Sequence, residues 1–214
     1  MHMPGSSLDD IVLEGRDVRL EPLAERHAAG LIAAAAEDPG LYQWTVVPQG
    51  HAATLAYIQA AIAARAAGAA LPFATVRRVD GAILGSTRLY DLESWAWPAG
   101  HTRHGRNLPD VCEIGHTWLS ATAIRTAANT EAKLLMLTHA FETWQVLRVC
   151  LKTDARNARS RAAIARIGGR FEGILRAHML AADFTARDSA RFSIVASEWP
   201  AVKQQLLARL RGGQ

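Results

Sequence analysis

Apolar and polar residues alternate along several short segments of this chain, while other segments are rich in alanine or carry apolar residues at helical spacing. Alternation predicts strands, because successive side chains of a strand point to opposite faces of its sheet. Helical spacing predicts helices that bury one face. The predicted strands span residues 12–23, 71–79, 82–92, 112–119, 147–152, 171–180 and 190–196, and the predicted helices span 25–37, 52–67, 130–144, 198–210 and part of 153–168. Helices and strands mixed in this order predict an α/β fold.

Turn-forming residues mark the ends of these elements. Pro22 ends the first strand, Asp80-Gly81 forms a hairpin turn, and Gly168-Gly169 ends the fourth helix. No linker or internal repeat interrupts the pattern. We therefore predict a single domain over residues 1–214, with a loose N-terminal tail at 1–10, a core at about 12–196 and a C-terminal helix at 198–210.

Residues 93–110 show no periodicity and are predicted to form a long loop. Loops of this length in a compact domain are usually functional or disordered. Trp95 and Trp97 are costly to leave in water, so part of the loop is expected to pack. His101 and His104 have the spacing of metal ligands, but no third ligand is nearby, and we predict no metal.

Composition and charge exclude several classes of protein. The excess of four basic residues is too small to indicate nucleic acid, and the basic residues lack interleaved aromatics. Cys112 and Cys150 lie in apolar strands and are predicted to be buried free thiols. No apolar run reaches membrane-spanning length and no signal peptide opens the chain, which predicts a cytoplasmic protein without a membrane partner.

The stretch from Cys112 to Thr130 combines a strand, a turn of small residues and the start of a long helix. The first N–H groups of a helix have no partner within it, and the helix dipole is positive at that end. Such a strand-turn-helix unit therefore predicts an anion site. Glu131 next to it would repel an anion, and Arg125 and Lys133 would offset that charge.

Several segments resemble, in order, motifs of the GNAT (Gcn5-related N-acetyltransferase) family, and of its RimJ/RimL branch, which acetylates ribosomal-protein N-termini. They are Arg19–Leu23, Leu84–Asp91, Glu113–Leu119, Arg125–Leu135, Lys152–Ser160 with Ile164–Gly168, and Phe171–Arg176. The resemblance implies a mixed, mostly antiparallel sheet that is splayed between its fourth and fifth strands and flanked by helices. It also implies transfer of an acetyl group from acetyl-CoA to a primary amine, with no metal.

The resemblance assigns the anion site to the pyrophosphate of CoA. The family signature Gln/Arg-x-x-Gly-x-Gly/Ala appears here without its glycines, and two registers fit. The first puts Ile124 at the Gln/Arg position, Ala127 at the first glycine and Asn129 at the second small position, and the other puts Arg125 and Ala128 at the first two of these. Alanine still allows close approach of phosphate to the backbone. The residues that the resemblance assigns to CoA are Trp118, Leu119, Arg125, Thr126, Ala127, Ala128, Asn129, Thr130, Asn157 and Arg159.

Catalytic roles follow from the same resemblance. Ser160 is the predicted general acid that protonates the leaving thiolate, and Asn157 would bind the pantetheine arm. The alternative is that Asn157 only caps a helix that contains Ser160. Glu113 is the predicted base, with a Glu paired to an arginine as the alternative and His116 as second candidate.

Several other assignments stay open at this point. Tyr90, Asp91 and His116 are predicted to contact the acceptor, although Tyr90 and Asp91 also fit a buried aromatic and a turn carboxylate. One or two of a group of arginines would meet the 3′-phosphate of CoA, the rest being a solvated helix face: Arg156, Arg159, Arg161, Arg166 and Arg170.

The sequence leaves three candidates for the role of the acceptor site. A protein or peptide N-terminus is expected, with a small amine (drug, polyamine or amino acid) or a non-catalytic CoA sensor as alternatives. A loop 93–110 folded over the site would favour a small molecule, and an open groove would favour a peptide. The oligomeric state, a homodimer included, is left open.

Overall fold

The computed structural model of this chain describes residues 11–212, so the predicted tail at 1–10 lies outside the described residues. Its eight-stranded sheet has the order β1-β2-β3-β4-β5-β6-β8-β7. The strands are β1 (Leu13–Glu14), β2 (Val18–Pro22), β3 (Ala70–Arg77), β4 (Ile83–Glu93), β5 (Val111–Leu119), β6 (Arg148–Asp154), β7 (Arg170–Leu180) and β8 (Ala186–Val195). Neighbouring strands are antiparallel except β5 and β6, which confirms the predicted mixed, mostly antiparallel sheet.

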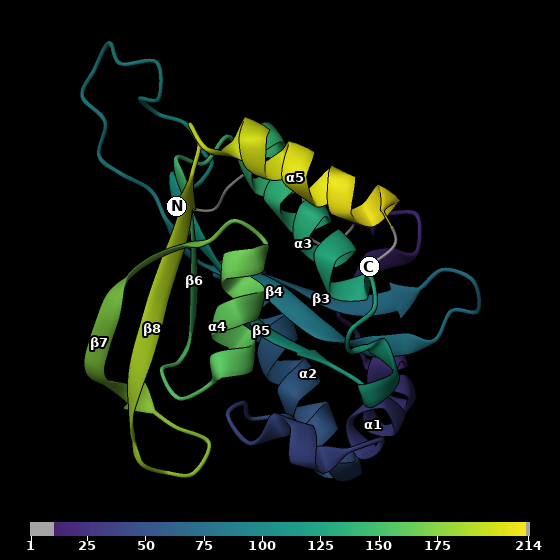
Figure 1. Cartoon of the computed structure of the whole chain (residues 1–214). Coiled ribbons are helices and arrows are strands. Elements are labelled where there is room, and N and C mark those ends of the chain that lie inside the picture. Colours follow the sequence, from purple (N-terminus) through teal and green to yellow (C-terminus); the bar gives the residue numbers. More distant parts are fainter. Residues whose placement is uncertain (1–10, 213–214) are drawn as a thin grey trace.

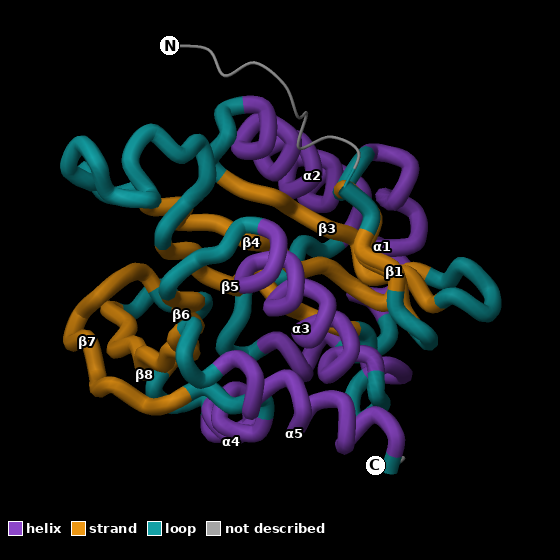
Figure 2. Tube along the Cα trace, turned by 90° about the horizontal axis from the view of Figure 1, so that it is seen from above, coloured by secondary structure: helices purple, strands orange, loops and turns teal. Residues whose placement is uncertain are grey.

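Helices cover both faces of the sheet (Figures 1 and 2). On one face lie α1 (Ala28–Ala36) and α2 (Gly50–Ala66), and on the other lie α3 (Ala128–Thr138), α4 (Ala158–Arg166) and α5 (Trp199–Arg211). Leu31 and Ile58 are fully buried between the first pair and the sheet, and Met136 and Leu206 are fully buried on the other side. Burial of these faces is the main driving force for the fold.

The pairing of β5 with β6 is short. Only three residue pairs join them, from Val111 opposite Arg148 to Glu113 opposite Cys150. Beyond Glu113 the two strands diverge, which is the predicted splay. The separation leaves backbone groups of both strands, on the sides that face each other, without a ladder partner among the described residues.

A β-bulge lies in the diverging part of β5. Ser86 of β4 pairs with Trp118 and Arg88 pairs with Gly115, so His116 and Thr117 together face the single residue Thr87. His116 takes a positive φ of 50° to accommodate the extra residue. Bulges redirect side chains and often lie beside functional sites.

Some element boundaries differ from the predictions. The first predicted strand is two strands, and the helix predicted at 130–144 ends as α3 and continues as a π-helical turn at His139–Thr143. β8 begins at Ala186, earlier than predicted, because exposed Ala186 and partly buried Arg187 pair with Leu180 and Met179 of β7. Exposed hairpins lack the alternation that marks a half-buried strand.

The loop between β4 and β5 projects from the body of the protein (Figure 1). It packs on itself around buried Asp110, whose carboxylate accepts hydrogen bonds from Trp95 N (2.8 Å), Trp97 Nε1 (2.9 Å) and Arg103 Nη1 (3.0 Å). The Trp97 ring stacks on His101 at 4.2 Å between centroids. Part of the loop therefore packs, as predicted: Trp97 is partly buried, whereas Trp95 stays 47% exposed.

Candidate active site

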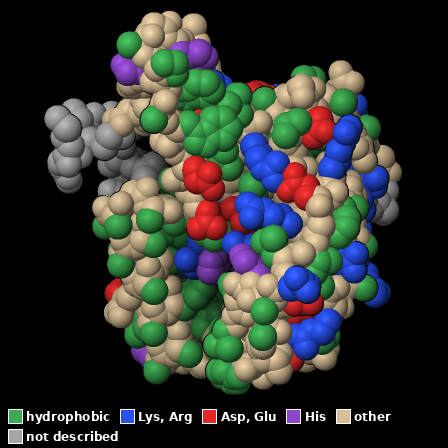
Figure 3. Space-filling view, turned by 90° about the vertical axis from the view of Figure 1, so that its left-hand side faces the viewer, with side chains coloured by type: hydrophobic (Ala, Val, Ile, Leu, Met, Phe, Trp, Pro, Cys, Tyr) green, Lys and Arg blue, Asp and Glu red, His purple; other side chains and the backbone are tan. Residues whose placement is uncertain are grey.

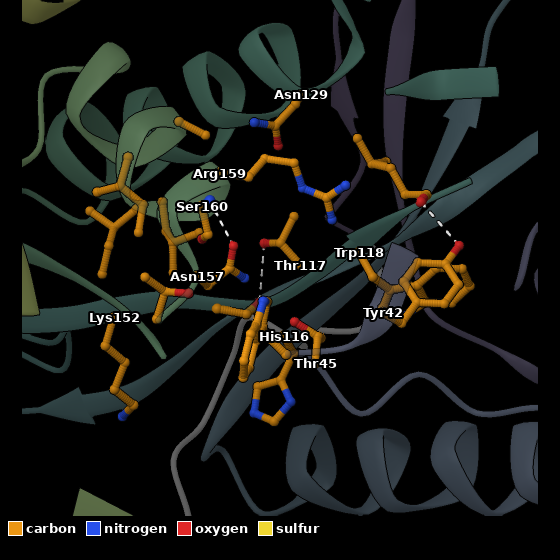
Figure 4. A pocket seen from close by; sticks show the side chains of 18 of the residues that line it. Tyr42, Thr45, His116, Thr117, Trp118, Asn129, Lys152, Asn157, Arg159 and Ser160 are labelled. Atoms are coloured by element: carbon orange, nitrogen blue, oxygen red, sulfur yellow. Dashed lines mark hydrogen bonds between the residues drawn. The ribbon is translucent and has the colours of Figure 1, made fainter. Parts of the chain in front are cut away.

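A cavity of about 770 Å³ opens where β5 and β6 diverge. Its lining comes from both strands, the start of α3, α4, the segment 41–46 and the β7–β8 hairpin. Figure 4 shows side chains from these elements pointing into it, and in Figure 3 acidic, basic and histidine side chains gather around a hollow on one face.

One end of the cavity lies beside the first turn of α3 and is positively charged. Arg125, Thr126 and Asn129 line it, and Arg166 of α4 completes it. Neither Arg125 nor Arg166 has a side-chain hydrogen bond or ion pair with any residue in 11–212. Two unpaired guanidinium groups beside a helix N-terminus form an anion site.

The remaining predicted residues of this turn lie off the cavity. Ala127 and Ala128 line a smaller pocket on the other side of the turn, and the Thr130 side chain is buried. Thr126 holds the turn together, because its Oγ1 donates to Ala123 O (2.7 Å) and accepts from Ala128 N (3.2 Å). A role of these residues toward CoA would run through their backbone N–H groups, and it stays a prediction.

The expected repulsion by Glu131 is wrong. Its buried carboxylate turns away from the cavity and accepts hydrogen bonds from three backbone N–H groups, those of Arg16 (2.6 Å), Asp17 (2.8 Å) and Val18 (2.7 Å). A Cβ at Gly15 would come within 2.6 Å of Glu131 Cδ, so glycine permits this approach. Glu131 joins the β1–β2 turn to α3.

Lys133 contacts the bulge and lines the cavity. It is buried, and its Nζ donates to Thr87 Oγ1 (3.1 Å) and Thr117 Oγ1 (2.6 Å) without any carboxylate partner in the described part of the chain. Burial lowers the pKa of Lys133 to about 7. Sequence reasoning treated this lysine only as a counter-charge, and its spacing from Thr87 gave no sign of the contact.

Replacing Lys133 by methionine is expected to change how stability depends on pH. Because the folded-state pKa is about 7 and that of the unfolded chain is about 10.4, the unfolded chain binds more protons between these values. The contribution of Lys133 to the free energy of unfolding is therefore lowest at about neutral pH and rises toward about pH 10. Urea unfolding at about pH 7, 8.5 and 10 should show this rise in the wild type relative to Lys133→Met, and parallel curves would contradict it.

The N-terminus of α4 brings two predicted residues together. Asn157 caps the helix, its Oδ1 accepting a hydrogen bond from Ser160 N (2.9 Å), and both side chains line the cavity (Figure 4). The Ser160 hydroxyl has no partner among residues 11–212. Asn157 therefore caps the helix, and both Asn157 and Ser160 also line the cavity.

Arg159 also lines the cavity but is held by the chain, since its Nη2 donates to Leu41 O (2.8 Å). The other arginines of this region are largely engaged. Arg156 pairs with Asp154 (2.8 Å) and Asp183 (2.9 Å), and Arg170 pairs with Glu198 (2.8 Å). Arg166 is therefore the member of the predicted arginine group that remains available at the cavity.

Aromatic residues build the wall next to the diverging β5. Trp118 is buried and meets Tyr42 edge to face at 5.9 Å, and the Tyr42 hydroxyl donates to Leu119 O (3.1 Å). Tyr42 lies in the short 3-10 turn Pro39–Tyr42 that follows α1, and nothing in its sequence context indicated this contact. The predicted positions Trp118 and Leu119 both line the cavity.

Glu113 lies at the apex of the splay, buried behind the cavity wall. Its Oε1 accepts a hydrogen bond from the Tyr90 hydroxyl, and its Oε2 accepts one from Lys152 Nζ at 3.1 Å. Lys152 also reaches Asp91 at 3.4 Å. Tyr90 and Lys152 line the cavity, whereas Glu113 and Asp91 do not. Burial, and then the Glu113 charge, raise the pKa of Tyr90, so its hydroxyl stays protonated.

His116 of the bulge projects into the cavity beside Tyr90, with the two rings edge to face at 5.0 Å. Surrounding protein, and then the positive charges of Arg88 and Lys152, lower the pKa of His116 to about 4. The imidazole is therefore neutral at neutral pH. A Cβ at Gly115 would lie 2.6 Å from Tyr90 Cε1, so glycine at this position leaves room for the Tyr90 ring.

Three further observations concern the cysteines, metal ions and membrane-spanning helices. Cys112 and Cys150 are buried and free, as predicted. Within residues 11–212 no three His, Cys, Asp or Glu side chains gather so as to hold a metal ion. No helix in the same range combines the length and apolar character that crossing a membrane requires.

Comparisons with known proteins agree with this geometry. The family model of the acetyltransferase (GNAT) domain matches residues 17–170. A GCN5-related N-acetyltransferase from Brucella melitensis superposes with a TM-score of 0.77 at 30% identity, over 95% of this chain and 86% of that chain. No curated protein sequence matches the chain significantly.

Two other solved structures bear on the predicted RimJ/RimL branch. Mycobacterium smegmatis RimJ, in complex with CoA-disulfide, is 26% identical with a TM-score of 0.72, covering 89% of this chain and 88% of that chain. A ribosomal-protein-S5-alanine acetyltransferase from Vibrio fischeri shares the fold at 15% identity and a TM-score of 0.68, over 89% and 99% of the two chains. With its family-model match and its splayed sheet, this chain belongs to the GNAT family of acetyl-CoA-dependent N-acetyltransferases.

Proposed function

We propose that this enzyme acetylates the free α-amine at the N-terminus of a protein or peptide. The observation that carries the proposal is the open far end of the cavity. It is framed by Trp44, Thr45 and Val46 on one side and by Met179 and Leu180 on the other. No residue of the loop 93–110 lines it, so the extended chain of a peptide has an unobstructed path.

The residues present fit acetyl-CoA, which supplies an acetyl group activated as a thioester. Arg125, Arg166 and the start of α3 provide positive charge for its phosphates at one end. The diverging strands provide unpaired backbone groups for the amides of its pantetheine arm. The Ser160 hydroxyl, which has no other partner, is the donor available to the leaving sulfur.

The incoming amine must also lose a proton. In our proposal Glu113 is the final acceptor, and the proton reaches it through Tyr90, whose hydroxyl takes the amine's proton as it passes its own to Glu113. His116 is the second candidate, because its neutral imidazole reaches the cavity directly.

Replacing Glu113 by glutamine is expected to lower kcat about tenfold or more, because an amide cannot accept the relayed proton. Replacing Tyr90 by phenylalanine should have an effect of the same size, since it removes the relay. The pH dependence of kcat/KM for both variants, set beside that of His116→Gln, tests the order of the two candidates. Loss of activity confined to His116→Gln would make His116 the base.

Replacing Arg125 and Arg166 together by alanine is expected to raise the KM for acetyl-CoA about tenfold at low salt. The effect should shrink at about 0.5 M salt, because salt screens the attraction between exposed charges. Steady-state kinetics at two salt concentrations measure both changes. Arg176→Ala, at an exposed position of β7 outside the cavity lining, is the control. An unchanged KM would remove these two arginines from the site.

Thiol release from acetyl-CoA, measured against a panel of amines, tests the acceptor. The panel contains peptides with free N-termini, the same peptides with blocked N-termini, polyamines and aminoglycosides. Release with the free peptides alone is the expected result. Release with polyamines or aminoglycosides alone would make this a small-molecule acetyltransferase, and CoA binding without release to any amine would favour a sensor.

A further inference from the structure

Two arginines near Tyr90 and His116 take no part in the chemistry described above. We propose that they bind an anionic group of the acceptor, so that the preferred substrate is an amine with a carboxylate close to it. This inference rests on the proposed function, within which it names peptides with aspartate or glutamate as first or second residue. The two residues are Arg88 of β4 and Arg187 of β8.

Arg88 is a buried cation without an acidic partner. It is 9% exposed, its Nε is buried without a hydrogen bond, and no ion pair joins it to any residue in 11–212. Its guanidinium lies over the Tyr57 ring at 5.2 Å, directly behind the cavity lining to which Tyr57 belongs and Arg88 does not. Across the ladder it pairs with Gly115, the neighbour of His116. A buried charge without a partner is costly, which favours a ligand that supplies one.

Arg187 approaches the same region from the opposite side. It lines the cavity next to Met179, its partner in the β7–β8 ladder. Its Nε is likewise buried without a partner, and the described residues offer its side chain no hydrogen bond or ion pair. The charge of Asp154, and then that of Glu113, act on Arg187, while that of Arg88 acts on His116, so both arginines lie near the Tyr90–His116 pair.

Two other cations at this end of the cavity are already neutralised. Lys152 is shared by Glu113 and Asp91, and Arg156 is held by Asp154 and Asp183. Arg88 and Arg187 thus contribute surplus positive charge at this end, beside Lys133, whose ammonium contacts two threonine hydroxyls and no acidic side chain among residues 11–212.

The phosphates of CoA are poorly placed to take up this surplus charge. Their proposed partner Arg125 lies beyond Leu119, and β5 rises about 13 Å between Gly115 and Leu119 at about 3.3 Å per residue. The nearby acceptor is the remaining source of an anion.

The test compares kcat/KM for matched peptides that differ only in aspartate against asparagine, or glutamate against glutamine, at the first and second positions. Free aspartate and glutamate, with asparagine and glutamine, form a second arm. The wild type is expected to prefer the acidic member about tenfold to a hundredfold, the range of a charge-assisted hydrogen bond. Arg187→Met and Arg88→Met should each bring the ratio close to one, with partial recovery in Arg187→Lys.

The ratio is measured within one protein preparation, so a variant that folds poorly still gives a valid value. Arg176→Met on the exposed face of β7 should keep the wild-type ratio. A wild-type ratio near one or below it, with peptides still acetylated, overturns the inference and leaves the proposed function intact. An Arg187-dependent preference found only among the free amino acids overturns the peptide acceptor and supports the anionic subsite.

Discussion

Replacing Ser160 by alanine is expected to lower kcat about 100-fold while the affinity for CoA changes little. The Ser160 hydroxyl lines the cavity and has no partner among residues 11–212, so it is free to protonate the departing sulfur. Alanine preserves the helix, because Asn157 caps α4 through the backbone N–H of residue 160 and not through its hydroxyl. The loss therefore reflects the missing proton donor.

Single-turnover measurements with saturating acetyl-CoA, and a separate titration of CoA binding, divide the effect between chemistry and binding. Ser197→Ala is a matched control, since Ser197 is exposed in the turn between β8 and α5 and outside the cavity lining. Full turnover by Ser160→Ala would remove the serine from catalysis. A loss that appears entirely as weaker CoA binding would reassign it to holding the substrate.

Replacing Glu131 by alanine is expected to lower the free energy of unfolding by about 3 kcal/mol. The change leaves the N–H groups of Arg16, Asp17 and Val18 without their acceptor, and the last of these bonds is buried. Glutamine keeps one acceptor oxygen, so Glu131→Gln should lose less. Urea unfolding followed by circular dichroism gives both values.

Glu14→Ala provides the comparison for this result. Glu14 is a carboxylate of the same N-terminal region, but it is exposed and its ion pair is with Arg78 at 3.4 Å. Exposed pairs contribute about 0–1 kcal/mol. If Glu131→Ala lowered the free energy of unfolding no more than Glu14→Ala, the contact between α3 and the β1–β2 turn would not stabilise the fold as expected.

The order of elements could be predicted from the sequence because each depends on local signals. Pro22, the Asp80-Gly81 turn and the alternation in 71–92 mark the first strands without knowledge of their neighbours. The π-helical turn at His139–Thr143 and the early start of β8 carry no such signal, since the tertiary contacts around them decide their conformation.

The candidate site divides in the same way. Asn157, Ser160 and the first turn of α3 are local motifs, and their positions at the cavity followed from the family resemblance. The contacts of Lys133 with Thr87 and of Glu131 with Arg16 join residues 46 and 115 positions apart. Arg187 lies in an exposed hairpin whose pattern is weak. Such pairs follow only from the packed structure.

The three residue pairs between β5 and β6 have a mechanical consequence. The sheet behaves as two leaves joined by a short seam, with β1–β5 in one leaf and β6–β8 in the other. On the side of α3 and α5, the Phe141 ring stacks on the Trp199 ring with 5.3 Å between centroids, and this contact joins the two leaves. A ligand that fills the cavity touches both leaves and binds only when they are correctly spaced. CoA should therefore act as a cross-brace, and its binding should slow amide hydrogen exchange along the unpaired parts of both strands.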